Sequence, residues 1–161
     1  MHTQQRLMLS LVAVLTAAVG PAHAEDDIVK LVSAQNGKCL QPLNGSLQRG
    51  EAIVQEPCNG SHAQQWLVHP VSATKLHLIN RSSGLCLDVA GKAVNGAPID
   101  QWPCNWISNE NWSFGITNNL LSSGVSHTWS HCIATSGNQN GLQMELRFCN
   151  GNISQLWNRP Q

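Results

Sequence analysis

The chain has 161 residues, nine Lys and Arg balance nine Asp and Glu, and 42% of the residues are apolar while only 11% are charged. This balance argues against a nucleic-acid partner held through phosphate contacts, which needs a surplus of basic side chains. The apolar content excludes a disordered chain, and no apolar run of about 18 residues follows the N-terminal region, so we expect no helical membrane span.

Residues 1–24 have the pattern of a secretory signal peptide. Arg6 supplies a positive charge, residues 7–19 are almost all apolar, and Ala22-His23-Ala24 has the small-x-small pattern of a cleavage site. The apolar run is too short for a membrane anchor. We therefore predict cleavage after Ala24 and secretion to an extracellular or periplasmic compartment, where the six cysteines are expected to pair.

Residues 25–161 are predicted to form one domain built from three copies of a sequence unit. Each copy has a cysteine followed by an apolar residue, a second cysteine 17 to 19 positions later, and a tryptophan eight positions after that. The tryptophans are Trp66, Trp112 and Trp157, spaced by 46 and 45 positions. The copies cover about residues 28–70, 71–116 and 117–161.

Short strands and tight turns are predicted within each copy. Residues 75–79 are typical of a strand, and the turn signals are Asn36-Gly37, Asn44-Gly45 and Asn95-Gly96. A β-propeller has a similar repeat length but needs about four to eight blades. We therefore predict a closed all-β structure with pseudo-threefold symmetry, in which one tryptophan from each copy lies in a shared centre.

Six cysteines allow fifteen connectivities. The repeat favours one bond within each copy, because equivalent positions then form equivalent bonds. Each bond would close a loop of about 18 residues and stabilise the fold by about 3 kcal/mol in the chain-entropy model. A zinc site is not expected, because no Cys-x-x-Cys pair is present. The predicted pairs are Cys39–Cys58, Cys86–Cys104 and Cys132–Cys149.

The three copies resemble the repeats of ricin-B-type lectins. Residues 64–66 (Gln-Gln-Trp) and 155–157 (Gln-Leu-Trp) carry the Gln-x-Trp signature of that family, which is altered to Glu-Asn-Trp at 110–112; residues 84–89 and 102–104 are also similar. The resemblance covers residues 28–158. It implies a β-trefoil of twelve strands, with a six-stranded barrel capped by three hairpins. It also implies the same disulfides and a carbohydrate-binding role.

The resemblance further implies a shallow sugar pocket in each competent copy. Such a pocket needs a carboxylate just after the first cysteine, an aromatic ring two residues before the second cysteine, and an amide side chain three residues before the core tryptophan. The middle copy meets these demands with Asp88, Trp102 and Asn109. Asp100 and Glu110 stand where the family usually has Gln, and we include both in the predicted carbohydrate site.

The first and third copies lack these groups and are predicted to be structural. Gln41, which keeps some polar capacity, makes the first copy the better candidate for an exception. Trp106 lies outside the repeat pattern and is predicted either to fill the core or to extend a binding surface. The residues at the three site positions are Gln41, Glu56 and Ala63 in the first copy and Ala134, Arg147 and Ser154 in the third.

The predicted function is a secreted, lectin-like protein with one galactoside-type site in the middle copy, no cofactor, no metal and no catalysis. A glycosidase pair among the acidic residues is not expected, because an open, shallow site does little to raise the pKa of a carboxylate. The expected partners are glycans. The alternative is a protein-interaction or receptor-binding subunit that joins a second secreted chain, as in a toxin or enzyme complex.

Overall fold

The computed structural model describes residues 27–117, 119–122 and 131–160, so the predicted signal peptide lies outside the described residues. No helix among these residues is long and apolar enough to cross a membrane.

The described chain contains fourteen strand segments and four 3-10 helices, which confirms the all-β prediction. The strands are β1 (Asp27–Val29), β2 (Val32–Ser33), β3 (Cys39–Pro42), β4 (Ile53–Glu56), β5 (Trp66–Pro70), β6 (Leu76–Asn80), β7 (Cys86–Val89), β8 (Ile99–Trp102), β9 (Trp112–Phe114), β10 (Leu120–Ser122), β11 (His131–Ala134), β12 (Leu142–Gln143), β13 (Glu145–Phe148) and β14 (Trp157–Asn158). The 3-10 helices are η1 (Leu43–Gly45), η2 (His62–Gln64), η3 (Ser108–Glu110) and η4 (Ile153–Gln155).

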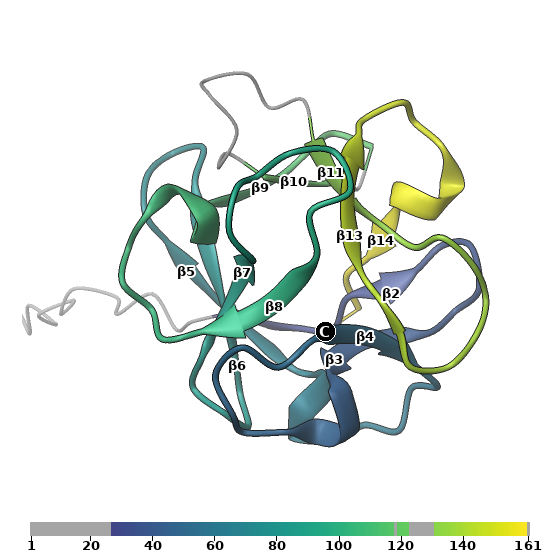
Figure 1. The fold of residues 1–161 in the computed structure, drawn as a ribbon, viewed down its shortest axis with the longest axis horizontal. Helices are drawn as coiled ribbons and strands as arrows, with labels where there is room; N and C mark the ends of the chain where they lie inside the picture. The colour runs from purple at the N-terminus through teal and green to yellow at the C-terminus, as the bar shows by residue number, and fades with distance from the viewer. Residues whose placement is uncertain (1–26, 118, 123–130, 161) are drawn as a thin grey trace, which may run out of the picture.

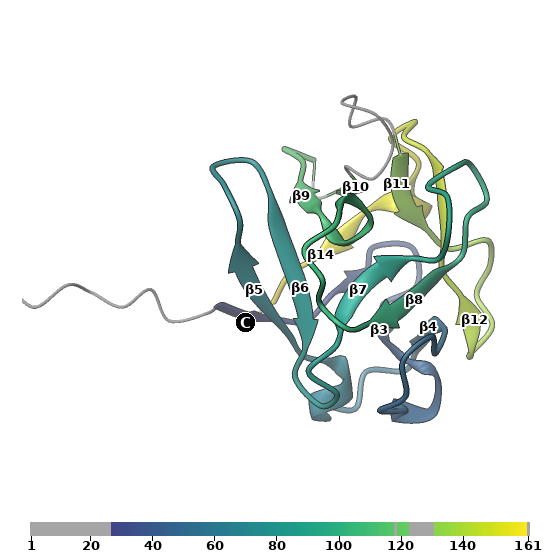
Figure 2. The same cartoon turned by 60° about the vertical axis from the view of Figure 1, so that its left-hand side comes forward.

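The three copies occupy three sectors around a common centre (Figure 1). Each copy contributes one antiparallel pair whose first strand has the first cysteine as its first or second residue: β3 with β4, β7 with β8, and β11 with β13. A second set of antiparallel pairs joins β5 with β6, β9 with β10, and β14 with β2. The last pair links the end of the chain to its beginning, so the threefold arrangement closes on itself. Figure 2 shows the long β5–β6 hairpin along one side of the molecule.

The fourteen segments correspond to the twelve predicted strands with two interruptions. Strand β12 pairs with β4, whereas β13 pairs with β11, and Met144 between them marks the change of partner. In the same way β1 pairs with β5, whereas β2 pairs with β3 and β14. Each interrupted strand therefore leaves one neighbour and joins another.

The three repeat tryptophans form the shared centre, as predicted. Trp66, Trp112 and Trp157 are fully buried. Each indole Nε1 donates to the backbone carbonyl that follows the first cysteine of its own copy, at 3.2, 2.8 and 3.1 Å respectively. Because a buried indole N–H needs an acceptor, this repeated bond fixes the tryptophan and the cysteine strand to each other. The acceptors are the carbonyl oxygens of Leu40, Leu87 and Ile133.

The three predicted disulfides are present. The bonds join Cys39 to Cys58, Cys86 to Cys104, and Cys132 to Cys149. In each pair the first cysteine is fully buried at the start of a strand. The second cysteine begins the loop that leads to a 3-10 helix, so each disulfide anchors this loop to the core.

Candidate functional site

The β7–β8 hairpin brings three of the predicted site residues to one face. Asp88 and Asp100 are directly opposite each other across the two strands. Trp102 is two residues further along β8, and alternate residues of a strand share a face. Trp102 is 38% exposed, whereas Asp88 and Asp100 are only 7% and 9% exposed. The ring therefore lies at the surface and the two acids lie deeper.

The two aspartates form a repelling pair in which the Asp88 carboxyl donates a hydrogen bond to Asp100. Burial, together with the nearby charges of Asp100 and Glu110, raises the pKa of Asp88 from 3.8 to about 7. Burial also raises the pKa of Asp100, and the hydrogen bond from Asp88 partly offsets that rise. The expectation that this site would leave its carboxylate pKa values little changed is therefore wrong. That expectation assumed an open site, whereas the two acids lie below the Trp102 ring and are shielded from solvent.

Two carboxyl oxygens in this pair lack a hydrogen-bond partner. They are Oδ1 of Asp88 and Oδ1 of Asp100, and both are buried. The backbone of Asp100 pairs with β7 on one side and forms an isolated bridge to Ala52 of the first copy on the other. An unsatisfied buried acceptor costs about 1–3 kcal/mol, so such a pair is retained at a net cost to folding.

The first copy contributes to the surroundings of Trp102. The guanidinium of Arg49 lies 5.7 Å from the centre of the Trp102 ring, within cation–π range. Gly50 has a φ of +76°, which favours glycine, and a Cβ there would lie 3.4 Å from the indole, so this turn packs directly beside the ring. Gln101 holds this loop in place, because its Nε2 donates to the carbonyls of Ser46 and Gln48 at 2.9 and 2.8 Å.

Asn109 lies at the site but uses its amide group internally. Its Nδ2 donates to the carbonyls of Val89 and Gly91 at 2.8 and 2.7 Å. These bonds tie η3 to the chain that follows β7. The resemblance to the family implies an amide that both donates to and accepts from sugar hydroxyls. In the structure the backbone engages its N–H donors, so only the Oδ1 acceptor is left for a ligand.

Glu110 is the clearest correction to the predicted site. Its side chain is fully buried, and its carboxylate accepts from the backbone N–H groups of Asn105 and Trp106. Gln64 and Gln155 accept equivalent bonds from Asn59 and Asn150, at 2.8 and 2.9 Å. The residue at this position therefore anchors the loop after the second cysteine, and a ligand cannot reach it.

A recurrent asparagine could have revealed this anchoring role from the sequence. The residue directly after the second cysteine is Asn59, Asn105 or Asn150 in the three copies. A Gln or Glu follows five positions later each time. No comparable signal marks Arg49 and Gly50, because they reach Trp102 from a different copy.

The first copy has no free polar group at the equivalent of Asp88. Gln64 Nε2 donates to Gln41 Oε1 at 2.8 Å, and both side chains are buried. The amide pair of the first copy is thus replaced in the middle copy by two acids, Asp88 and Glu110, whose repulsion contributes to the raised pKa of Asp88.

The third copy opens into a polar cleft of about 320 Å³ at the equivalent place. Arg147, which stands in the position of Trp102, donates from Nε and Nη2 to one oxygen of Glu145 at 2.8 and 2.6 Å. Phe148 is 60% exposed and lines the same cleft. Ala134 and Ser154, which take the places of Asp88 and Asn109, also line this cleft.

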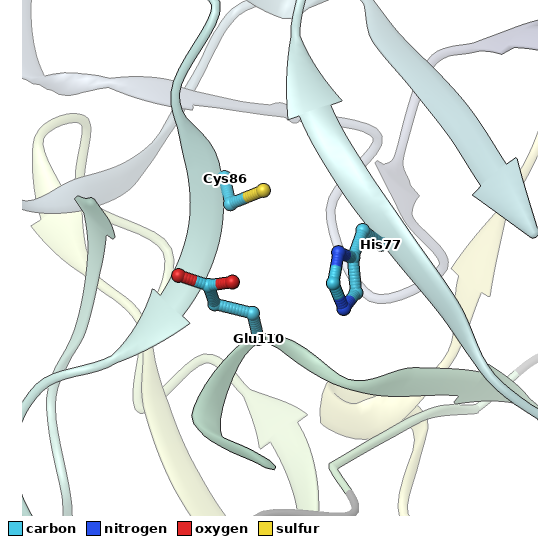
Figure 3. A group of neighbouring side chains, drawn as sticks. All are labelled: His77, Cys86 and Glu110. Atoms are coloured by element: carbon cyan, nitrogen blue, oxygen red, sulfur yellow. The ribbon is translucent and has the colours of Figure 1, made fainter. Parts of the chain in front are cut away.

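A second cluster of potential ligand atoms lies on the inner side of the middle copy. His77, Cys86 and Glu110 place one nitrogen, one sulfur and one oxygen within 4.8 Å of one another (Figure 3). Cys86 is bonded to Cys104, so its sulfur is not a thiolate, and the Glu110 carboxylate is engaged by backbone N–H groups. These residues do not fit a metal ion.

Comparison with known proteins agrees with this description. A family model described as ricin-type beta-trefoil lectin domain-like matches residues 16–102 and 76–132. Nigrin b of Sambucus nigra is 31% identical over 67 residues, which are 41% of this chain and 11% of that protein. The chain thus spans about a tenth of the length of this curated relative.

Several solved structures share the fold. An exo-beta-1,3-galactanase from Clostridium thermocellum has a TM-score of 0.78 and 26% identity, covering 84% of this chain and 30% of the enzyme chain. The designed threefold-symmetric protein ThreeFoil has a TM-score of 0.77 and 22% identity, covering 83% and 98%. The Macrolepiota procera ricin B-like lectin, solved with lactose, has a TM-score of 0.70 and 18% identity, covering 86% and 98%. With the family model, these similarities confirm the predicted β-trefoil.

Proposed function

The chain belongs to the ricin-type β-trefoil lectin domain-like family, and from this premise we propose that it binds carbohydrate through one site in its middle copy, without catalysis. The site consists of Trp102, Asp88, Asp100 and the Oδ1 acceptor of Asn109. We further propose that the chain is cleaved after Ala24 and secreted, which three disulfides in the fold support.

One observation carries the proposal: the exposed indole of Trp102 and a pair of carboxyls, 7% and 9% exposed, share one face of the β7–β8 hairpin. The indole can stack on the apolar C–H face of a pyranose, a contact we place on the scale of aromatic pairs at about 0.5–1.5 kcal/mol. Carboxyl oxygens accept hydrogen bonds from sugar hydroxyls, and bonds to charged acceptors are the stronger ones. The buried position of Asp88 and Asp100 makes them the floor of this site.

A galactoside is the proposed ligand. The similar proteins include an exo-beta-1,3-galactanase and a lectin solved with lactose, and lactose ends in a galactose unit. Catalysis is not proposed for the acid pair. A retaining or inverting glycosidase places its two carboxyl groups on either side of the scissile bond, at least about 5 Å apart, whereas Asp88 and Asp100 are hydrogen-bonded to each other.

The test is a glycan array followed by titration calorimetry with galactose and lactose. Trp102→Ala should weaken binding about tenfold, and Asp88→Asn should weaken it by a similar factor, because the amide replaces one acceptor oxygen for the sugar hydroxyls by a donor. Arg147→Ala is the matched control at the equivalent position of the third copy, and its affinity should equal that of the wild type. Absence of glycan binding, or binding that survives Trp102→Ala, would refute the proposal and favour a protein-interaction role.

A further inference from the structure

The second residue after the second cysteine differs between the middle copy and the other two copies. In the first and third copies the second residue of this loop is glycine, Gly60 or Gly151, with φ of +76° and +75°. In the middle copy the same position is Trp106, with φ of +64°. Left-handed backbone is natural for glycine but strained for a large side chain. A residue that strains the backbone needs another reason to be there.

Glu110 is adapted to hold Trp106 in this conformation. The carboxylate accepts from the Trp106 N–H at 2.8 Å in addition to the Asn105 N–H at 3.1 Å. Gln64 and Gln155 have a single side-chain oxygen, and their Nε2 groups donate to the carbonyls of Pro57 and Phe148. A carboxylate can accept both loop N–H groups, whereas the nitrogen of an amide cannot accept either. The change from Gln to Glu therefore accompanies the change from Gly to Trp.

The indole of Trp106 rests on two imidazoles and faces solvent. His77 stacks on it with ring centres 4.7 Å apart and planes 22° apart, and His69 is tilted by 54° at 5.3 Å. His69 and His77 are opposite each other in the β5–β6 hairpin, so both approach from the same face of that hairpin. Trp106 is nevertheless 58% exposed, which leaves the other side of the ring open.

We propose that Trp106 is a second stacking platform, which binds a further sugar unit of an extended glycan whose terminal unit occupies the Trp102 site. This inference rests on the proposed carbohydrate function. Trp102 is the last residue of β8. The loop that follows carries Trp106 and leads to η3, which contains Asn109, so the two tryptophans stand at the two ends of one short segment. The ligand class is therefore an oligosaccharide rather than a single terminal sugar.

The surroundings of Trp106 fit a sugar better than a protein partner. Asn105 and Ser108 are exposed polar residues on the same loop, and Ile107 is the other large apolar side chain exposed there, at 48%. A specific protein interface needs about 800 Å² from each partner, with an apolar centre. One open ring bordered by hydroxyl and amide groups suits a pyranose, which presents an apolar face and polar edges.

Trp106→Gly is the decisive variant, because it restores the residue that the first and third copies use. The probes are galactose and the β-1,3- and β-1,4-linked galactobioses and galactotrioses, titrated by calorimetry. The wild type should bind the best trisaccharide about three- to tenfold more tightly than galactose, the factor expected for one aromatic contact. Trp106→Gly should abolish this gain, leave the galactose affinity unchanged and keep the wild-type melting temperature within a few degrees.

Two controls separate the platform from general hydrophobicity and from folding. Trp106→Phe should keep most of the gain, because it keeps a ring, and Ile107→Ala should keep all of it. If the wild type binds galactose but gains nothing from added units, or if Trp106→Gly retains the gain, this inference is wrong while the proposed function stands. If neither galactose nor any longer probe binds, the proposed function fails and the inference fails with it.

Discussion

The middle and third copies present the same hairpin with opposite electrostatics. In the middle copy Asp88 is opposite Asp100, and each retains a buried Oδ1 without a hydrogen bond. In the third copy Ala134 is opposite Glu145, and Arg147 neutralises that glutamate with two hydrogen bonds. At equivalent positions of the hairpin, the middle copy therefore has two acids with unsatisfied oxygens, and the third copy has an acid that is hydrogen-bonded to an arginine.

The difference shows where the fold is stabilised and where it gives up stability. Each copy has the same core tryptophan, the same indole hydrogen bond and the same disulfide, so the scaffold is equally supported on all sides. Among the residues that the structure describes, only the middle copy adds a repelling acid pair and a tryptophan in left-handed backbone. Costly features that gather in one of three equivalent units are typical of a functional site.

The largest expected effect comes from removing the disulfide of the middle copy or, separately, that of the third copy. The double variant Cys86→Ala/Cys104→Ala should lower the free energy of unfolding by about 3 kcal/mol, because the unfolded chain loses a cross-link. Cys132→Ala/Cys149→Ala should cost about the same, since the two loops have nearly equal length. Urea denaturation measures both.

Glycan binding should separate these two disulfide variants. Loss of the Cys86–Cys104 bond frees the loop that carries Asn109 and should weaken binding about tenfold or more at a temperature where the protein is still folded. Loss of the Cys132–Cys149 bond should leave the affinity unchanged. Equal loss of affinity in both variants would contradict a site confined to the middle copy.

The next largest effect is a pH dependence that originates in Asp88. The pKa of Asp88 is about 7 in the folded protein and near 3.8 in the unfolded chain, so between these values only the folded state holds the proton. The free energy of unfolding should therefore fall as the pH rises from 4 to 7, by about 1–2 kcal/mol, a fraction of the full value because the site opens to solvent at Trp102.

Comparison with Asp88→Asn isolates this contribution from that of every other titrating group. Asparagine cannot ionise, so the difference in stability between the variant and the wild type should change with pH over this window and be constant below about pH 3. Denaturant titrations at pH 3, 4, 5, 6 and 7 provide the curve. A difference that does not vary with pH would mean that Asp88 is not perturbed.

These features were predictable from the sequence to different degrees. The disulfides and the core tryptophans were predictable because they depend on residue types at fixed spacing, and every copy repeats that spacing. The grouping of Trp102 with Asp88 was implied by the resemblance to the family, which places both at fixed distances from the cysteines. All three features depend on residue types at fixed positions of the repeat.

The roles of Glu110, Asn109 and Trp106 were not predictable in the same way. They depend on loop conformation, which decides that Glu110 faces backbone N–H groups and that Asn109 donates to Val89 and Gly91. The resemblance to the family assigned Asn109 and Glu110 to the ligand because it transfers positions and not orientations. The exposure of Trp106 depends on contacts with His69 and His77, which belong to a hairpin earlier in the chain.

A smaller effect is expected from Asp100→Asn, which removes one acid from the pair. The amide ends the charge repulsion with Asp88 and can donate to its carboxylate, so the pKa of Asp88 should fall toward its ordinary value. The stability at pH 7 should rise by about 1 kcal/mol. Denaturant titration measures the gain, and NMR titration of the Asp88 carboxyl measures the pKa. An unchanged pKa would refute the coupling between the two aspartates.

The smallest effect is expected from Glu145→Gln, the matched change in the third copy. Here the acid is already paired with Arg147, and the two side chains are 20% and 44% exposed, so the ion pair is well solvated. Exposed pairs contribute about 0–1 kcal/mol, and glutamine can still accept a hydrogen bond from the guanidinium. The stability at pH 7 should therefore fall by about 0.5 kcal/mol or less, opposite in sign to the effect of Asp100→Asn. A gain in stability would mean that the third copy also holds an unfavourable acid, and the contrast between the two copies would then disappear.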